Sequence, residues 1–132
     1  MIKENNILIV DDSETNLVLL EAILEDSGCN VEKAFSAKEA LVSLTRGIPD
    51  LILLDLLMPN ENGFDLLKKL KSNNIFKSIP IIIVTAFANN ENKIMAKELG
   101  AADIIEKPIN IKEFLQIIDD VLNQNSELQK TN

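Results

Sequence analysis

The stretch "LILLDLLMPN" (residues 51–60) places a carboxylate, Asp55, at the end of a short aliphatic run. Four consecutive aliphatic residues, 51–54, are typical of a strand that is buried on both faces, as in a parallel sheet. An ionised carboxylate beside such a run is costly unless a partner compensates its charge. We therefore expect a central buried strand over 51–54 and a compensating group where that strand ends.

Other short aliphatic runs predict further strands, and the segments between them show helical spacing, with Ser36 and Asn110 as N-caps. Strict alternation predicts a parallel sheet with helices on both faces. Because crossovers are right-handed, the economical topology is a doubly wound, flavodoxin-like α/β fold of five strands in the order 2-1-3-4-5, counted along the chain. The predicted strands span 6–10, 30–34, 51–54, 80–86 and 102–106, and the predicted helices span 14–27, 37–45, 64–70, 90–99 and the segment after Asn110.

The length of 132 residues favours one domain, which we place at 1–122 with 123–132 as a polar tail or the start of a linker. A net charge of −8 argues against direct nucleic-acid binding and against anionic membrane surfaces. No signal peptide or membrane span is expected, and the single Cys29 fits a reducing, cytoplasmic setting. The absence of His excludes Ser-His and Cys-His catalysis and His-ligated metals within this chain.

Polar residues follow four of the five predicted strands, and ligands of open α/β sheets bind at these carboxyl ends. Three of these residues are carboxylates that the strand order brings to one place, so a cation or protons must offset their repulsion. Oxygen-only ligands suit Mg²⁺ better than zinc. The residues at these strand ends, polar ones and their neighbours, are Asp11 and Asp12 after the first strand, Asp55 after the third, Thr85 and Ala86 at the fourth, and Lys107 and Pro108 after the fifth.

This set of side chains indicates a phosphoryl-transfer site. Thr85 can donate a hydrogen bond to a phosphoryl oxygen, and Lys107 can neutralise its charge. No glycine-rich loop is present to cradle a nucleotide, and the remaining nucleophile is a carboxylate, which can form an acyl phosphate. For a lone Asp12, a role as a mere helix N-cap would be the alternative.

The segments "ILIVDDS", "LILLDLLMP", "PIIIVTA" and "IIEKP" resemble the receiver domains of two-component response regulators over about residues 5–122. The resemblance implies that Asp55 accepts a phosphoryl group from a histidine kinase or a His-containing phosphotransfer protein. It implies Mg²⁺ held directly by Asp12, Asp55 and the backbone carbonyl of Leu57, with Asp11 acting mostly through water. Such a domain is a signalling phosphoacceptor rather than an enzyme.

The resemblance also implies that Thr85, Ala86 and Lys107 contact the phosphoryl group, and that the Lys107–Pro108 peptide bond is cis. Such domains often carry an aromatic switch residue three positions before the lysine, where this chain has Ile104. They often signal or dimerise through the fourth helix, fifth strand and fifth helix, here about 90–122.

Apolar residues stand two positions after Asp55 and two after Thr85, namely Leu57 and Phe87. In such domains both positions flank the phosphoryl group and influence attack by water, so we expect a long-lived acyl phosphate.

Two alternatives to a switching receiver stay open, and a third is disfavoured. A phosphatase of haloacid-dehalogenase type also uses an Asp nucleophile with Mg²⁺, although Asp55-Leu56-Leu57 lacks its second Asp. A degenerate receiver would act only as a protein-binding module. An FMN-binding flavodoxin is disfavoured because no Ser/Thr/Gly-rich loop follows the first strand.

Overall fold

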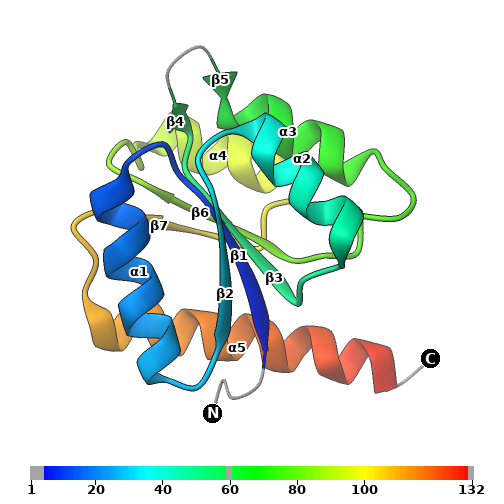
Figure 1. Cartoon of the computed structure of the whole chain (residues 1–132). Helices are drawn as coiled ribbons and strands as arrows, with labels where there is room; N and C mark the ends of the chain where they lie inside the picture. Colours follow the sequence, from blue (N-terminus) through cyan, green and yellow to red (C-terminus); the bar gives the residue numbers. More distant parts are fainter. Residues whose placement is uncertain (1–4, 59–60, 131–132) are drawn as a thin grey trace.

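The computed structural model describes residues 5–58 and 61–130. Its main element is a parallel sheet of five strands in the order β2-β1-β3-β6-β7 (Figure 1). This is the predicted 2-1-3-4-5 order, so the doubly wound α/β fold is confirmed. The strands are β1 (Asn6–Val10), β2 (Asn30–Ala34), β3 (Leu51–Leu54), β6 (Ile81–Thr85) and β7 (Asp103–Glu106).

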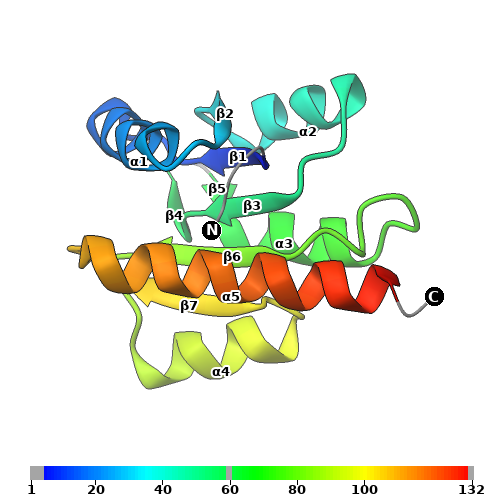
Figure 2. The same ribbon diagram turned by 90° about the horizontal axis from the view of Figure 1, so that it is seen from below.

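Helices cover both faces of the sheet (Figures 1 and 2). Helices α1 (Glu14–Asp26) and α5 (Ile111–Lys130) pack on one face. Helices α2 (Ala37–Arg46), α3 (Gly63–Lys71) and α4 (Asn90–Glu98) pack on the other. None of the helices in the described ranges combines the length and the apolar character that crossing a bilayer requires.

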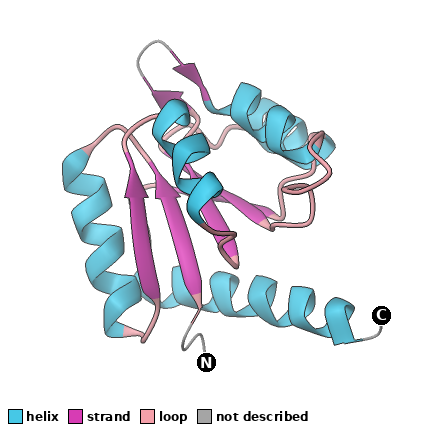
Figure 3. Cartoon of the chain, turned by 45° about the vertical axis from the view of Figure 1, so that its right-hand side comes forward, coloured by secondary structure: helices cyan, strands magenta, loops and turns pink. Residues whose placement is uncertain are grey.

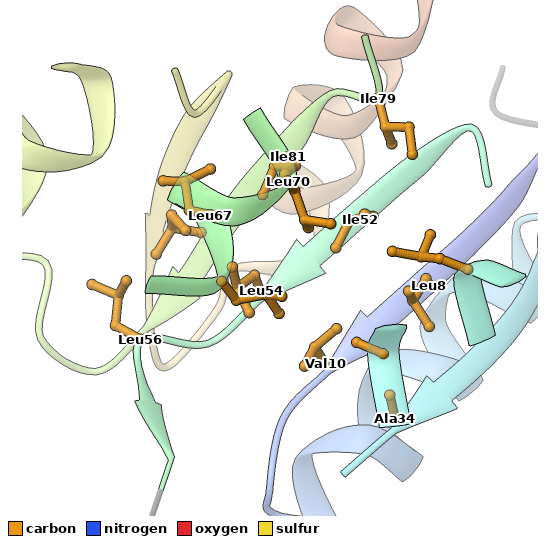
Figure 4. Packing of buried hydrophobic residues seen from close by; sticks show 14 of the residues in the cluster. Leu8, Val10, Ala34, Ile52, Leu54, Leu56, Leu67, Leu70, Ile79 and Ile81 are labelled. Carbon is orange, nitrogen blue, oxygen red and sulfur yellow. The ribbon is translucent and has the colours of Figure 1, made fainter. Parts of the chain in front are cut away.

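The central strands separate two apolar clusters, because successive side chains of a strand point to opposite faces. In β3, Leu51 and Leu53 enter the cluster with α1 and α5, whereas Ile52 and Leu54 enter the cluster with α2, α3 and α4. Figure 4 shows this second cluster, in which Leu54 lies close to Leu67 of α3. Each fully buried aliphatic side chain contributes about 1.5–3 kcal/mol, so β3 is anchored from both sides.

Polar side chains define where the helices begin. Ser36 caps α2 by accepting a hydrogen bond from the Glu39 backbone N–H at 3.1 Å, and Asn110 accepts from the Glu113 N–H at 3.0 Å. The Glu39 carboxylate reaches the Phe35 N–H at 3.1 Å, one residue earlier than a simple capping box places it. Both expected N-caps are confirmed.

Two features differ from the prediction. No element is predicted between the strand at 51–54 and the helix at 64–70, but this segment forms a short antiparallel pair, β4 (Leu57–Met58) with β5 (Glu61–Asn62) (Figure 3). Pro59 and Asn60 lie outside the described residues. Helix α5 continues to Lys130, so residue 122 is no break in secondary structure, and the domain boundary there stays a prediction.

Candidate functional site

Asp55 directly follows β3, at the carboxyl edge of the sheet. Its backbone N–H donates to the Val10 carbonyl at 3.0 Å, which continues the pairing of β3 with β1. Only 8% of the residue is exposed, and this burial is the main reason that its pKa is raised above the ordinary value. The neighbouring Lys107 lowers that pKa, and the charge of Asp11 raises it. The carboxylate therefore lies in a site where its charge needs compensation.

Lys107 supplies that compensation in this structure. Its Nζ lies 2.9 Å from Asp11 Oδ2 and 3.3 Å from Asp55 Oδ2, and it bridges the ends of β1 and β3 from beyond β7. The Lys107 backbone N–H donates to the Thr85 carbonyl at 2.9 Å, which fixes where the side chain begins. The Lys107–Pro108 peptide bond is cis, as expected.

Asp11, Asp12 and Asp55 form an acidic cluster. One oxygen from each lies within 4.8 Å of the others, with Asp11 and Asp55 buried and Asp12 exposed. An exposed carboxylate beside two buried ones allows an ion to enter from solvent while keeping several waters, as Mg²⁺ does. The oxygen-only donor set and its spacing therefore fit a hard divalent cation.

The first turn of helix α1 shows that Asp12 is not the N-cap of this helix. Ser13 is the N-cap, with its hydroxyl accepting from the Asn16 N–H at 3.3 Å. Asp11 is held by the same turn, because its Oδ1 accepts from the Ser13 N–H at 2.9 Å. Asp12 is therefore not the capping residue, and its exposed carboxylate is available for other contacts.

Thr85 ends β6 and is fully buried, with 0% exposure. Its Oγ1 accepts a hydrogen bond from the Phe87 N–H at 3.3 Å. Ala86 beside it is exposed. Ile104 is partly buried in β7 and packs against the α2–α3–α4 cluster. The structure thus brings Thr85 and Lys107 to the same sheet edge as Asp55.

Two large apolar residues close in sequence to the site residues are exposed. Leu57 and Phe87 are each 54% exposed, and the Leu57 N–H donates to Asp55 Oδ1 at 3.3 Å. That Leu57 and Phe87 flank a phosphoryl group stays a prediction. The role predicted for the Leu57 carbonyl as a metal ligand stays a prediction.

Gly63 is a residue that the sequence reasoning missed as part of the site. It begins α3, and a Cβ built on it would lie 2.3 Å from the Asp55 carbonyl oxygen. Its N–H donates to the Leu56 carbonyl at 3.0 Å, so the start of α3 presses directly on the backbone of the site. The only sequence signal was a glycine after the N-cap Asn62, and that pattern is also typical of an ordinary turn.

Comparisons with known proteins agree with this geometry. The family model described as "Response regulator receiver domain" matches residues 7–119. Among curated proteins, the chain is 37% identical over 116 residues to PilH of Pseudomonas aeruginosa, which covers 88% of the chain and 96% of PilH. It is 40% identical over 104 residues to the response regulator PleD of Caulobacter vibrioides, which covers 79% of this chain but only 23% of PleD.

Another curated relative is also longer than the chain, and a solved receiver domain structure has the same fold as the chain. The chain is 38% identical over 130 residues to the transcriptional regulatory protein CpxR of Escherichia coli and spans 54% of it. A receiver domain structure from Methanospirillum hungatei, described as CheY-like, superposes with a TM-score of 0.87 at 32% identity, covering 95% of this chain and 98% of that one. With the acidic cluster, Thr85 and Lys107 at one sheet edge, these matches show that the chain belongs to the receiver domains of two-component response regulators.

Proposed function

We propose that the chain receives a phosphoryl group on Asp55 from the phosphohistidine of a histidine kinase or a His-containing phosphotransfer protein. Response regulators in general act with such partners. The observation that supports the proposal most directly is the buried Asp55 carboxylate, with two further carboxylates within 4.8 Å and the Lys107 ammonium at 3.3 Å. Phosphoryl transfer depends on this kind of positioning and charge neutralisation.

The chemistry assigned to Asp55 is a displacement at phosphorus. An oxygen of the ionised carboxylate forms the new O–P bond, while the N–P bond of the partner's phosphohistidine breaks and the imidazole leaves with its electron pair. Lys107 neutralises negative charge on the phosphoryl oxygens, and the Thr85 hydroxyl and the Ala86 backbone provide hydrogen-bond donors. The domain takes part in its own phosphorylation in this way and loses the group slowly to water.

Receiver domains generally bind Mg²⁺, and the acidic cluster of this chain suits it. Asp12, Asp55 and the Leu57 carbonyl would hold the ion, with Asp11 contributing through water. The ion would supply positive charge against the phosphoryl oxygens and the three carboxylates.

The output of the domain is assigned to the surface of α4, β7 and α5, through which two copies could also pair. Charged side chains of both signs are exposed there, among them Lys93, Lys97 and Asp103, but exposed ion pairs are individually weak. Ile104 in β7 takes the position of an aromatic switch, so the signal would pass by aliphatic repacking. A cytoplasmic location agrees with the presence of a single cysteine, the buried Cys29.

Phosphorylation by a small donor tests the proposal without the unknown partner. The purified chain is incubated with acetyl phosphate and Mg²⁺, and the intact mass is then measured. We expect one phosphate adduct on the wild type, none on Asp55→Asn, and an unchanged adduct on Asp26→Asn, which removes an exposed carboxylate at the end of α1. An adduct that survives in Asp55→Asn, or no adduct with any donor, would contradict the proposal, and the second result would favour a degenerate receiver.

A further inference from the structure

The loop between β6 and α4 connects the buried Thr85 to the start of a helix. It lies at the same end of the sheet as the β4–β5 pair (Figure 1). Ala88 in the loop is buried, with 5% exposure, and Asn89 is the N-cap of α4. Phe87 lies in the loop between Thr85 and Ala88. Its backbone makes one hydrogen bond to Thr85 and one to Asn92 of α4.

The two hydrogen bonds of Phe87 differ in length. On the sheet side, its N–H donates to Thr85 Oγ1 at 3.3 Å. On the helix side, its carbonyl accepts from Asn92 Nδ2 at 2.6 Å. Because hydrogen bonds weaken as they lengthen beyond about 3.2 Å, the loop is held more firmly by α4 than by the threonine.

The Asn92 side chain is itself well placed for this contact. Asn89 does the capping, since its Oδ1 accepts from the Asn92 N–H at 2.8 Å and its carbonyl accepts from the Lys93 N–H at 2.9 Å. The carboxamide of Asn92 is therefore not needed to begin the helix. It projects from the first turn of α4 to the carbonyl of Phe87, five residues back in the chain.

The Thr85 hydroxyl oxygen accepts a hydrogen bond from the β6–α4 loop in this structure. Its hydrogen bond within the described residues is the one from Phe87, and it makes none with Asp55 or Lys107. A threonine that turns toward a phosphoryl group on Asp55 must release the Phe87 N–H or draw residues 86–87 with it. Drawing the loop inward stretches the short bond between Phe87 and Asn92.

We propose that Asn92 is a positioning residue that holds the β6–α4 loop in its phosphate-free arrangement, and that this hold opposes capture of a phosphoryl group by Thr85. The inference rests on the proposed phosphorylation of Asp55. Asn92 acts through Phe87 and touches no reacting atom. Its bond must break or lengthen when the threonine moves, so removing the bond should favour the phosphoryl-bound state.

The experiment measures binding of beryllofluoride, an anion whose beryllium becomes tetrahedral when it binds a carboxylate oxygen and so resembles the phosphorus of an acyl phosphate. Whole-chain wild type and Asn92→Ala are titrated in Mg²⁺. One hydrogen bond of ordinary strength corresponds to about 2- to 10-fold tighter binding by Asn92→Ala. Mg²⁺ affinity without beryllofluoride should stay unchanged, because Asn92 does not contact the acidic cluster. Asn90→Ala is the matched control, since its exposed side chain makes no hydrogen bond within the described residues.

A double-mutant cycle separates this role from general loosening of the helix. In a Thr85→Ala background the loop has no hydroxyl to release, so Asn92→Ala should no longer change beryllofluoride affinity. The inference is overturned if Asn92→Ala binds beryllofluoride equally well or more weakly than wild type, or if its effect persists without the Thr85 hydroxyl. If instead the wild type fails to bind beryllofluoride, or Asp55→Asn binds it equally well, the proposed function itself fails.

Discussion

The segments that follow β3 and β6 are alike in sequence but held in different ways. A site residue stands at the end of each strand, Asp55 directly after β3 and Thr85 as the last residue of β6. Two positions later each segment carries an apolar residue, Leu57 or Phe87, that is 54% exposed. After β3, backbone bonds hold the chain: β4 pairs with β5, and Gly63 bonds to Leu56. After β6, side-chain contacts to Thr85 and Asn92 hold Phe87.

In the function proposed for the chain, with Asp55 as phosphoryl acceptor and Thr85 as the hydroxyl that detects the phosphoryl group, this difference separates two tasks. The carboxylate that reacts must stay in place, because small displacements of reacting groups are costly in rate. The hydroxyl that detects the product must be able to move, because a group that makes the same contacts in both states cannot shift an equilibrium. The support of Asp55 is built from backbone and close packing, whereas the support of Thr85 is built from bonds that can be exchanged. The support of Asp55 and the support of Thr85 can be tested separately.

The largest effect on stability is expected at Lys107, which compensates the charges of Asp11 and Asp55. Lys107→Ala leaves the Asp11 and Asp55 carboxylates unpaired in a buried site, which should lower the free energy of unfolding by about 3 kcal/mol in metal-free buffer. Urea denaturation measures this. Lys112→Ala, on the exposed start of α5, should change stability by less than about 0.5 kcal/mol. A loss for Lys107→Ala no larger than that for Lys112→Ala would show that solvent screens the cluster.

Gly63 tests whether the support of Asp55 is as tight as the structure shows. Gly63→Ala places a methyl group against the Asp55 carbonyl and should cost about 1–3 kcal/mol, with reduced phosphorylation by acetyl phosphate because the acceptor shifts. Gly47→Ala is the control, since a Cβ there meets nothing within 4 Å. Equal stability of the two variants would mean that the start of α3 shifts to accommodate the methyl group at little cost in stability.

Metal and pH should act on the acidic cluster together. Mg²⁺ at ten times its Kd should stabilise the wild type by about 1.4 kcal/mol and Asp55→Asn by much less, as measured by thermal unfolding.

Without metal, Asp55→Asn should be more stable than wild type near neutral pH, because burial raises the pKa of Asp55. The native state then binds a proton that the unfolded state lacks, so wild-type stability rises as the pH falls through that raised pKa. The advantage of Asp55→Asn should therefore shrink toward acid pH; an advantage that grows there would contradict the sign of the shift.

The smallest effect concerns the two exposed apolar residues. Replacing them with polar side chains, Leu57→Asn and Phe87→Glu, should admit water to the acyl phosphate and speed its loss severalfold. The decay of phosphorylated protein is followed by intact mass after the donor is removed. Val42→Asn, a matched exposed position on α2, should leave the rate unchanged. If both site variants decay at the wild-type rate, the flanks do not control access of water.

Much of the fold could be predicted because its signals are local. Short aliphatic runs and N-cap residues such as Ser36 lie within a few positions of one another, and the observed element ends agree to within one residue for β1 to α4 except around Asp55. The site followed from one topological rule, that parallel strands end at a common edge. Asp55, Thr85 and Lys107 were found in that way.

What could not be predicted depends on distance in the chain or on exact packing. The ion pair of Lys107 with Asp11 joins residues 96 positions apart, and its length is set by the sheet rather than by either segment. The need for Gly63 arises from a backbone contact that only the packed α3 creates. The bond from Asn92 to Phe87 depends on a side-chain rotamer, for which a sequence offers no periodic signal.

Helix α5 is long relative to the sheet that it covers. Its contacts with the α1 side of the core run from Phe114 to Leu122, and the helix then continues to Lys130. At 1.5 Å per residue, those eight residues extend about 12 Å. Because a helix is stiff, a tilt of about 10° at Leu122 would move its end by about 2 Å. Helix α5 thus carries any change of its tilt within the domain onward, without a break in the helix, as a displacement of the backbone beyond Leu122.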